Sequence, residues 1–165
     1  MYMQNPRRCT MVRLICALVL ALLITTPSLG QQSLIGTYKI VSHDVQYTDG
    51  TAIKAMGNAP HGYLVLTPTR YLTFYTADNR KFGSSDADKA ALLNTLSGWS
   101  GAYRIEGGRM IIAVDVSWTE VWTGKNQVRN WALSGNRLTL TSDPAPDPRE
   151  PSKTHVVRTV WEKIE

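Results

Sequence analysis

Residues 109–134 read RMIIAVDVSWTEVWTGKNQVRNWALS, and two alternating runs within this stretch decide the fold. Successive side chains of a β-strand point to opposite faces, so residues 109–117 and 126–134 each predict one strand. A polar segment with Gly124 separates the two runs, which indicates neighbouring strands. In the first strand, one face carries Met110, Ile112, Val114 and Val116, and the other face carries Ile111, Ala113 and Asp115. In the second strand, one face carries Gln127, Arg129, Trp131 and Leu133.

Charged and polar side chains interrupt this apolar pattern. A carboxylate at Asp115, an amide at Gln127 and a guanidinium at Arg129 can meet across the two strands. A buried charge without a partner is costly, so we expect Asp115 and Arg129 to pair if both point inward. Two other roles stay open. Arg129 can hold a carboxylate or another anionic ligand group, and Asp115 can act as a general acid or base if burial raises its pKa.

Short β-patterned runs separated by turn residues dominate the rest of the chain, which is typical of an antiparallel sandwich or barrel. One helix is predicted at 86–96, capped by Ser85 or Asp86 and ended by Gly98. Residues 143–152 hold four prolines and are predicted to form a surface loop that cannot continue a sheet. Further strands are predicted at 35–47, 61–67, 71–76, 99–106, 137–142 and 154–164. The predicted fold class is all-β, a single antiparallel barrel of about eight strands that can enclose one small ligand.

A series of short motifs follows a characteristic order along the chain. They are Gly36-Thr37-Tyr38, Asp49-Gly50, the run from Pro60 to Leu64, the run from Gly101 to Arg104, Asp-x-Ser-Trp from Asp115, Trp-x-Gly-x-x-Gln-x-Arg from Trp122, the run from Gly135 to Leu140, and Trp161. Together they resemble the bacterial lipocalin-like domain family of calycin-type barrels, from about Leu34 to Lys163. Lys163 stands where many relatives carry arginine. The resemblance implies a lipocalin-like barrel more firmly than it implies a particular ligand.

The N-terminal residues 1–30 carry the pattern of a secretory signal peptide. Three arginines, Arg7, Arg8 and Arg13, precede the apolar run 14–24, and small residues follow it. A run of 11 residues is shorter than the roughly 20 that span a membrane, so cleavage is expected rather than a retained anchor. We therefore expect an exported protein, periplasmic or extracellular, with a single domain at residues 31–165 and no transmembrane span after cleavage.

Composition narrows the classes of partner. Both cysteines, Cys9 and Cys16, lie within the predicted signal peptide, so residues 31–165 contain no cysteine to form a disulfide. The same residues hold 15 basic and 13 acidic side chains, a formal charge of +2, without a basic run. Nucleic-acid binding is therefore not expected.

No catalytic signature is found in the sequence. There is no Gly-x-Ser-x-Gly elbow, phosphate-binding loop, dinucleotide fingerprint or cysteine nucleophile after residue 30. His43, His61 and His155 lack the spacing of a metal motif and are expected to be surface or hydrogen-bonded structural residues. We expect no cofactor and no metal, and we name no catalytic residue.

Aromatic and polar side chains supply the candidates for a ligand site. Tryptophan and tyrosine can line a pocket while their N–H and O–H groups orient a ligand, or they can simply fill a core, as we expect of Trp161. The candidate ligand-binding residues are Tyr63, Tyr71, Tyr103, Asp115, Trp118, Trp122, Gln127 and Arg129. The favoured function is binding of a small apolar or amphipathic molecule. The alternatives are a barrel enzyme of the isomerase, cyclase or lyase class and an envelope interaction protein with a filled barrel.

Overall fold

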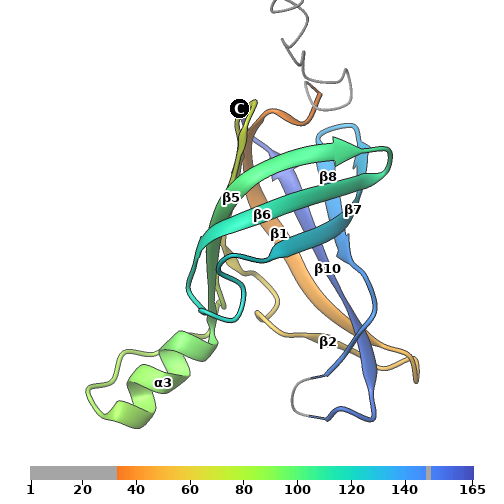
Figure 1. Cartoon of the computed structure of the whole chain (residues 1–165). Helices are drawn as coiled ribbons and strands as arrows, with labels where there is room; N and C mark the ends of the chain where they lie inside the picture. Colours follow the sequence, from red (N-terminus) through yellow and green to blue (C-terminus); the bar gives the residue numbers. More distant parts are fainter. Residues whose placement is uncertain (1–32, 148–149) are drawn as a thin grey trace, which may run out of the picture.

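Eight antiparallel strands close into a barrel in a computed structural model that describes residues 33–147 and 150–165 (Figure 1). Each strand pairs with the next, and pairing of the first strand with the last closes the sheet. The strands are β1 (Gly36–Tyr47), β3 (His61–Leu66), β4 (Arg70–Thr76), β5 (Leu96–Glu106), β6 (Arg109–Ser117), β7 (Asn126–Ser134), β8 (Arg137–Ser142) and β10 (Thr154–Lys163). The predicted all-β barrel is confirmed. The predicted signal peptide, residues 1–30, lies outside the described residues.

Two short strands extend the sheet where β1 and β10 run past their barrel neighbours (Figure 1). The strand β2 (Ala52–Lys54) pairs with β1, and β9 (Ala145–Pro146) pairs with β10. The prediction that residues 143–152 cannot continue a sheet is therefore wrong at this point. Pro146 is tolerated because β9 is the last strand of the sheet, where a missing N–H donor breaks no further ladder bond.

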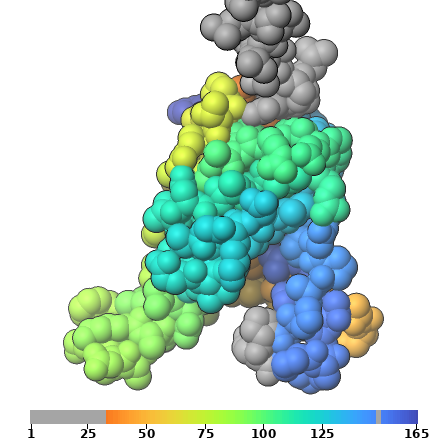
Figure 2. Space-filling model, viewed as in Figure 1, coloured from red at the N-terminus to blue at the C-terminus, as the bar shows by residue number. Residues whose placement is uncertain are grey.

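The helix α3 (Asp86–Asn94) projects away from the barrel (Figures 1 and 2). Ser85 is its N-cap, and Ser85 and Asp88 form a capping box. No residue of the helix is buried, so it contributes little to the core. The helix ends earlier than predicted because Leu96 already pairs with Thr76 at the start of β5. Gly98 therefore lies within β5 and does not end the helix. None of the helices in the described ranges has the length and apolar character that a bilayer span requires.

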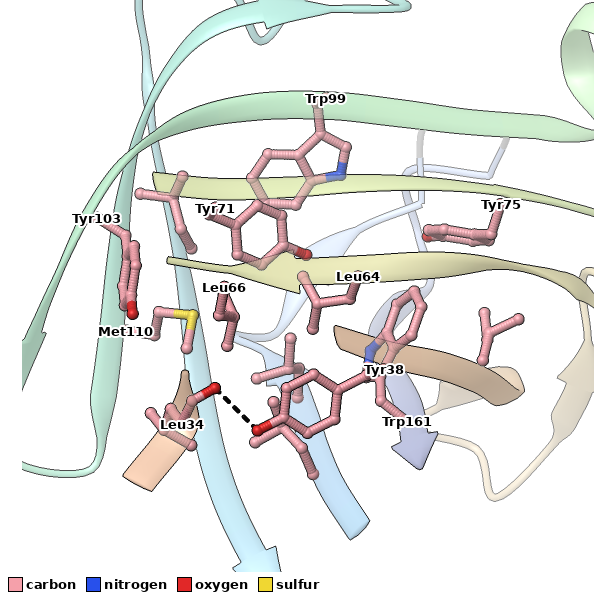
Figure 3. Close-up of a cluster of buried hydrophobic side chains, with 14 of the residues drawn as sticks. Leu34, Tyr38, Leu64, Leu66, Tyr71, Tyr75, Trp99, Tyr103, Met110 and Trp161 are labelled. Atoms are coloured by element: carbon pink, nitrogen blue, oxygen red, sulfur yellow. Dashed lines mark hydrogen bonds between the residues drawn. The ribbon is translucent and has the colours of Figure 1, made fainter. Parts of the chain in front are cut away.

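Buried apolar side chains form a filled core inside the barrel (Figure 3). Tyr38 is fully buried, and its hydroxyl donates to the carbonyl oxygen of Leu34 at 2.8 Å. Trp161 is 1% exposed, and its indole Nε1 donates to Thr159 Oγ1 at 2.8 Å. Trp161 is thus a core residue, as predicted. The other fully buried members of this group include Leu34, Leu64, Leu66, Met110, Ile112, Leu138 and Leu140.

A β-bulge interrupts β6 at Asp115. Ser100 of β5 pairs with Val116, whereas the next residue, Gly101, pairs with Val114, so Asp115 is the extra residue. The bulge turns Val116 to the outer surface, where it is 58% exposed. The prediction that Val116 shares a face with Met110 is therefore wrong, because strict alternation does not continue through a bulge.

Candidate ligand-binding cavity

A cavity lies inside the barrel next to the filled core, and Leu140 and Trp161 belong to both. The cavity has a volume of about 230 Å³ and an incomplete enclosure. Its aromatic lining comes from β4, β5, β10 and the connection between β6 and β7: Tyr71, Tyr75, Trp99, Trp118, Trp122 and Trp161. Its polar lining consists of His43, Asn94, Ser97, Arg129 and Thr159, and Met56, Leu96, Leu140 and Val157 complete the wall.

The aromatic rings pack in two groups around this space. The Tyr71 and Trp99 rings lie 4.5 Å apart between centroids with an interplanar angle of 30° (Figure 3). Trp99 meets Trp122 edge to face at 5.7 Å, and Trp122 meets Trp118 in the same way at 6.4 Å. On another side, Tyr75 packs edge to face against Trp161 at 5.5 Å. These geometries are the ones that aromatic quadrupoles favour, so the wall is well packed and presents mostly carbon to the cavity.

Arg129 brings a positive charge into this aromatic space. It lies opposite Met110 in the β6–β7 pairing and therefore shares the inner face of the barrel. Its guanidinium carbon lies 5.4 Å from the centroid of the Trp99 ring, a cation–π contact. Its Nη1 donates to the carbonyl oxygen of Val128 at 2.7 Å, and both Nη atoms make only 3.4 Å contacts with Gln127 Oε1.

No carboxylate in the described part of the chain forms an ion pair with Arg129. Burial lowers the pKa of the guanidinium, and Tyr71, Tyr75 and the more distant Asp143 partly oppose that shift. An arginine side chain nevertheless stays protonated in proteins. The cavity therefore contains a cation whose charge no contacting acid neutralises.

Asp115 lies on the outer face and does not pair with Arg129. Its Oδ2 is 2.6 Å from Nη1 of Arg70, and both side chains are about half exposed. The predicted Asp115–Arg129 pair is wrong, because the inner face of β6 carries Met110, Ile112 and Val114 and Asp115 points outward. A role for Asp115 as general acid or base inside the barrel fails for the same reason.

His43 contributes an uncharged polar group to the cavity wall. The residue is 9% exposed, and its ring centroid lies 5.4 Å from that of Tyr75. Burial lowers the pKa of His43 to about 4, the charge of Arg129 adds to this effect, and Asp44 opposes it. Nδ1 of His43 and Nε1 of Trp118 are both buried and have no hydrogen-bond partner among the residues that the structure describes. Two unsatisfied polar atoms thus belong to residues that line the cavity, a situation that native proteins usually avoid.

Some of the ligand-binding residues predicted from the sequence line the cavity, and others do not. Tyr71, Trp118, Trp122 and Arg129 line the cavity, and Gln127 contacts it through Arg129. Tyr63 does not, because it pairs with Phe74 on the outer face and is 52% exposed. Tyr103 is buried in the filled core, and its hydroxyl donates to the carbonyl oxygen of Thr67 at 2.9 Å.

Sequence reasoning missed His43 and Trp99 as cavity residues. The β1–β10 pairing shifts register between Ile40 and Ser42, just before His43. Counting alternate residues from Tyr38 therefore does not predict which face the His43 side chain points to. Trp99 alternates with Gly101 and Tyr103 along β5, a signal that was present in the sequence. Among residues 33–147 and 150–165, no group of three His, Cys, Asp or Glu side chains is placed to hold a metal ion.

The model of the lipocalin-like domain family matches residues 35–164, which include all eight strands of the barrel. No curated protein matches the sequence. The family match covers most of the chain, and the closed eight-stranded barrel with its internal cavity agrees with it. The chain belongs to the lipocalin-like domain family.

Proposed function

We propose that the protein binds a small, mostly apolar molecule inside its barrel and that Arg129 orients this ligand. The observation that carries the proposal is an aromatic cavity containing a cation that no acid of the described residues contacts. Aromatic walls remove apolar ligand surface from water, which contributes roughly 25 cal/mol per Å² before the costs of binding. A few polar groups in a mostly apolar pocket fix orientation and supply specificity.

The two alternative functions have weaker support. An interaction protein with a filled barrel does not need a cavity of about 230 Å³ next to its core. A barrel enzyme needs a proton donor or acceptor that faces the substrate, and Asp115 faces outward. His43 does line the cavity, but its pKa of about 4 makes the imidazole a weak base. We therefore favour noncovalent binding over catalysis.

We also propose that the protein acts outside the cytoplasm, in the periplasm or the extracellular space. Support comes from the sequence pattern of residues 1–30, where arginines precede an apolar run that is too short for a membrane span.

Native mass spectrometry of protein purified from its own host tests the binding function. We expect a reproducible small-molecule adduct on the wild-type protein and its loss or weakening in Trp122→Ala, which removes part of the cavity wall. Tyr63→Ala is the matched control, because it removes an exposed aromatic ring from the outer face. Denaturing extraction then gives the ligand class. A bare protein mass that persists after lysate is added back would contradict the proposal.

A further inference from the structure

We propose that the cavity selects compact aromatic monocarboxylates of about ten non-hydrogen atoms, with the carboxylate on Arg129. This inference rests on the proposed function and names the ligand class of the same site. Three independent properties of the cavity lead to it: the free edge of the guanidinium, the aromatic wall beside it, and the volume.

The guanidinium of Arg129 lines the cavity and contacts no acid of the described residues. Arg70, Arg104 and Arg109, on the outer surface, each contact a carboxylate at 2.6 to 2.7 Å. A charge in a partly buried site carries a larger desolvation cost and gains more from a partner than these exposed ones do. The apo cavity thus holds a charge that an anionic ligand group would neutralise.

The shape of the free donors favours a carboxylate. Nη1 of Arg129 is already engaged by the carbonyl oxygen of Val128, whereas Nη2 has only the 3.4 Å contact with Gln127. Nε of Arg129 donates no hydrogen bond to any of the described residues. A guanidinium can donate two parallel hydrogen bonds to the two oxygens of a carboxylate, and the Nε and Nη2 atoms form one of the edges that do so.

The surroundings of Arg129 favour an aromatic ligand body. The guanidinium lies over the Trp99 ring, and Trp99 in turn contacts Tyr71 and Trp122. A ligand whose carboxylate reaches Arg129 therefore places its next atoms against ring faces and edges. An aromatic ligand ring gains offset or edge-to-face contacts there that an alkyl chain does not make.

The volume limits the size of the ligand. A cavity of about 150 Å³ holds benzene, with its six carbon atoms. By proportion, the 230 Å³ of this cavity hold about nine non-hydrogen atoms, close to the ten of phenylacetate. Drug-sized ligands occupy pockets of roughly 300 to 1,000 Å³. A long-chain fatty acid exceeds this volume, so part of its chain would have to extend through the open side of the cavity.

Calorimetric titration of the ligand-stripped protein tests this selectivity. The probes are phenylacetate, its neutral analogue phenylacetamide, and hexadecanoate. We expect phenylacetate to bind at least about tenfold more tightly than phenylacetamide, because hydrogen bonds to charged groups are the stronger ones. We expect hexadecanoate to bind more weakly than phenylacetate. Arg129→Met should abolish the difference in affinity between phenylacetate and phenylacetamide and keep the affinity for phenylacetamide within about threefold of wild type. The outer-surface control Arg104→Met should leave both affinities unchanged.

The outcomes separate this inference from the proposed function. If phenylacetamide binds as tightly as phenylacetate, or if hexadecanoate binds best, the ligand class is wrong and binding in the barrel stands. The same holds if phenylacetate does not bind while the native protein carries an adduct. If no probe binds and the native protein carries no adduct, both proposals fail. The comparison of the two wild-type affinities decides the question even if Arg129→Met does not fold.

Discussion

His43 makes stability depend on pH in a way that its position in the cavity wall explains. The residue is 9% exposed and lies near the cation of Arg129, and burial together with that charge lowers its pKa from 6.5 to about 4. The folded protein therefore resists protonation of this ring, whereas the unfolded chain does not. We predict that His43→Gln, which keeps a polar side chain but cannot titrate, reduces the loss of stability at acidic pH.

The size of the effect follows from the two pKa values. Between pH 6.5 and pH 4 the unfolded chain binds one more proton than the folded protein at this residue, so the free energy of unfolding falls as pH falls. The contribution of neutral His43 is fully present above pH 6.5 and is lost as pH falls toward 4. The full difference is about 3 kcal/mol, and about 2 kcal/mol of it is already lost at pH 5.

Urea unfolding at pH 8 and pH 5 measures this contribution. The wild-type protein should lose about 2 kcal/mol more stability between these pH values than His43→Gln does. His61→Gln, a change at an exposed histidine, is the matched control and should behave like the wild type. The reasoning is refuted if wild type and His43→Gln lose equal stability, or if NMR titration gives His43 a pKa near 6.5 in the folded protein.

Three further predictions concern the charges of the barrel. Arg129→Met should raise the free energy of unfolding of the apo protein by about 1 to 3 kcal/mol, because it removes a partly buried cation without a contacting acid; a loss of stability in urea unfolding would contradict this. Asp115→Asn should lower the free energy of unfolding by less than about 1 kcal/mol, because the pair of Asp115 with Arg70 is half exposed. It should leave the affinity for phenylacetate unchanged in calorimetry, and a large loss of affinity would place Asp115 at the site. Saturating phenylacetate should raise the pKa of His43 in an NMR titration, because the bound carboxylate offsets the charge of Arg129; an unchanged pKa would show that the anion binds elsewhere.

Much of the barrel could be predicted because turn residues mark both ends of its strands. The predicted bounds of β6, β7 and β8 are those of the structure, since Gly107, Gly108, Gly124 and Gly135 punctuate a clear period of two. Prediction of α3 was less accurate at its C-terminal end. Leu96 fits a helical spacing as well as a strand, and its pairing with Thr76 decides the matter. Local pattern does not contain that long-range contact.

The candidate site was only partly predictable because two irregularities change which side chains face inward. The bulge at Asp115 and the register shift between Ile40 and Ser42 each break the period of two, and neither has a clear mark in the sequence. Arg129 was recognised as a possible anion anchor from its chemistry alone. The expected pair of Arg129 with Asp115 was wrong, because Asp115 lies on the outer face of β6 and the alternating pattern alone does not show which face of a strand points into the barrel. Its role in binding stays a prediction.

A crystal structure of the protein with phenylacetate tests the central claim most directly. The account predicts the ligand inside the barrel, with its two carboxylate oxygens about 3 Å from Nε and Nη2 of Arg129 and its ring against Trp99 and Trp122. Ligand bound only outside the barrel, or bound inside with its carboxylate away from Arg129, would contradict it.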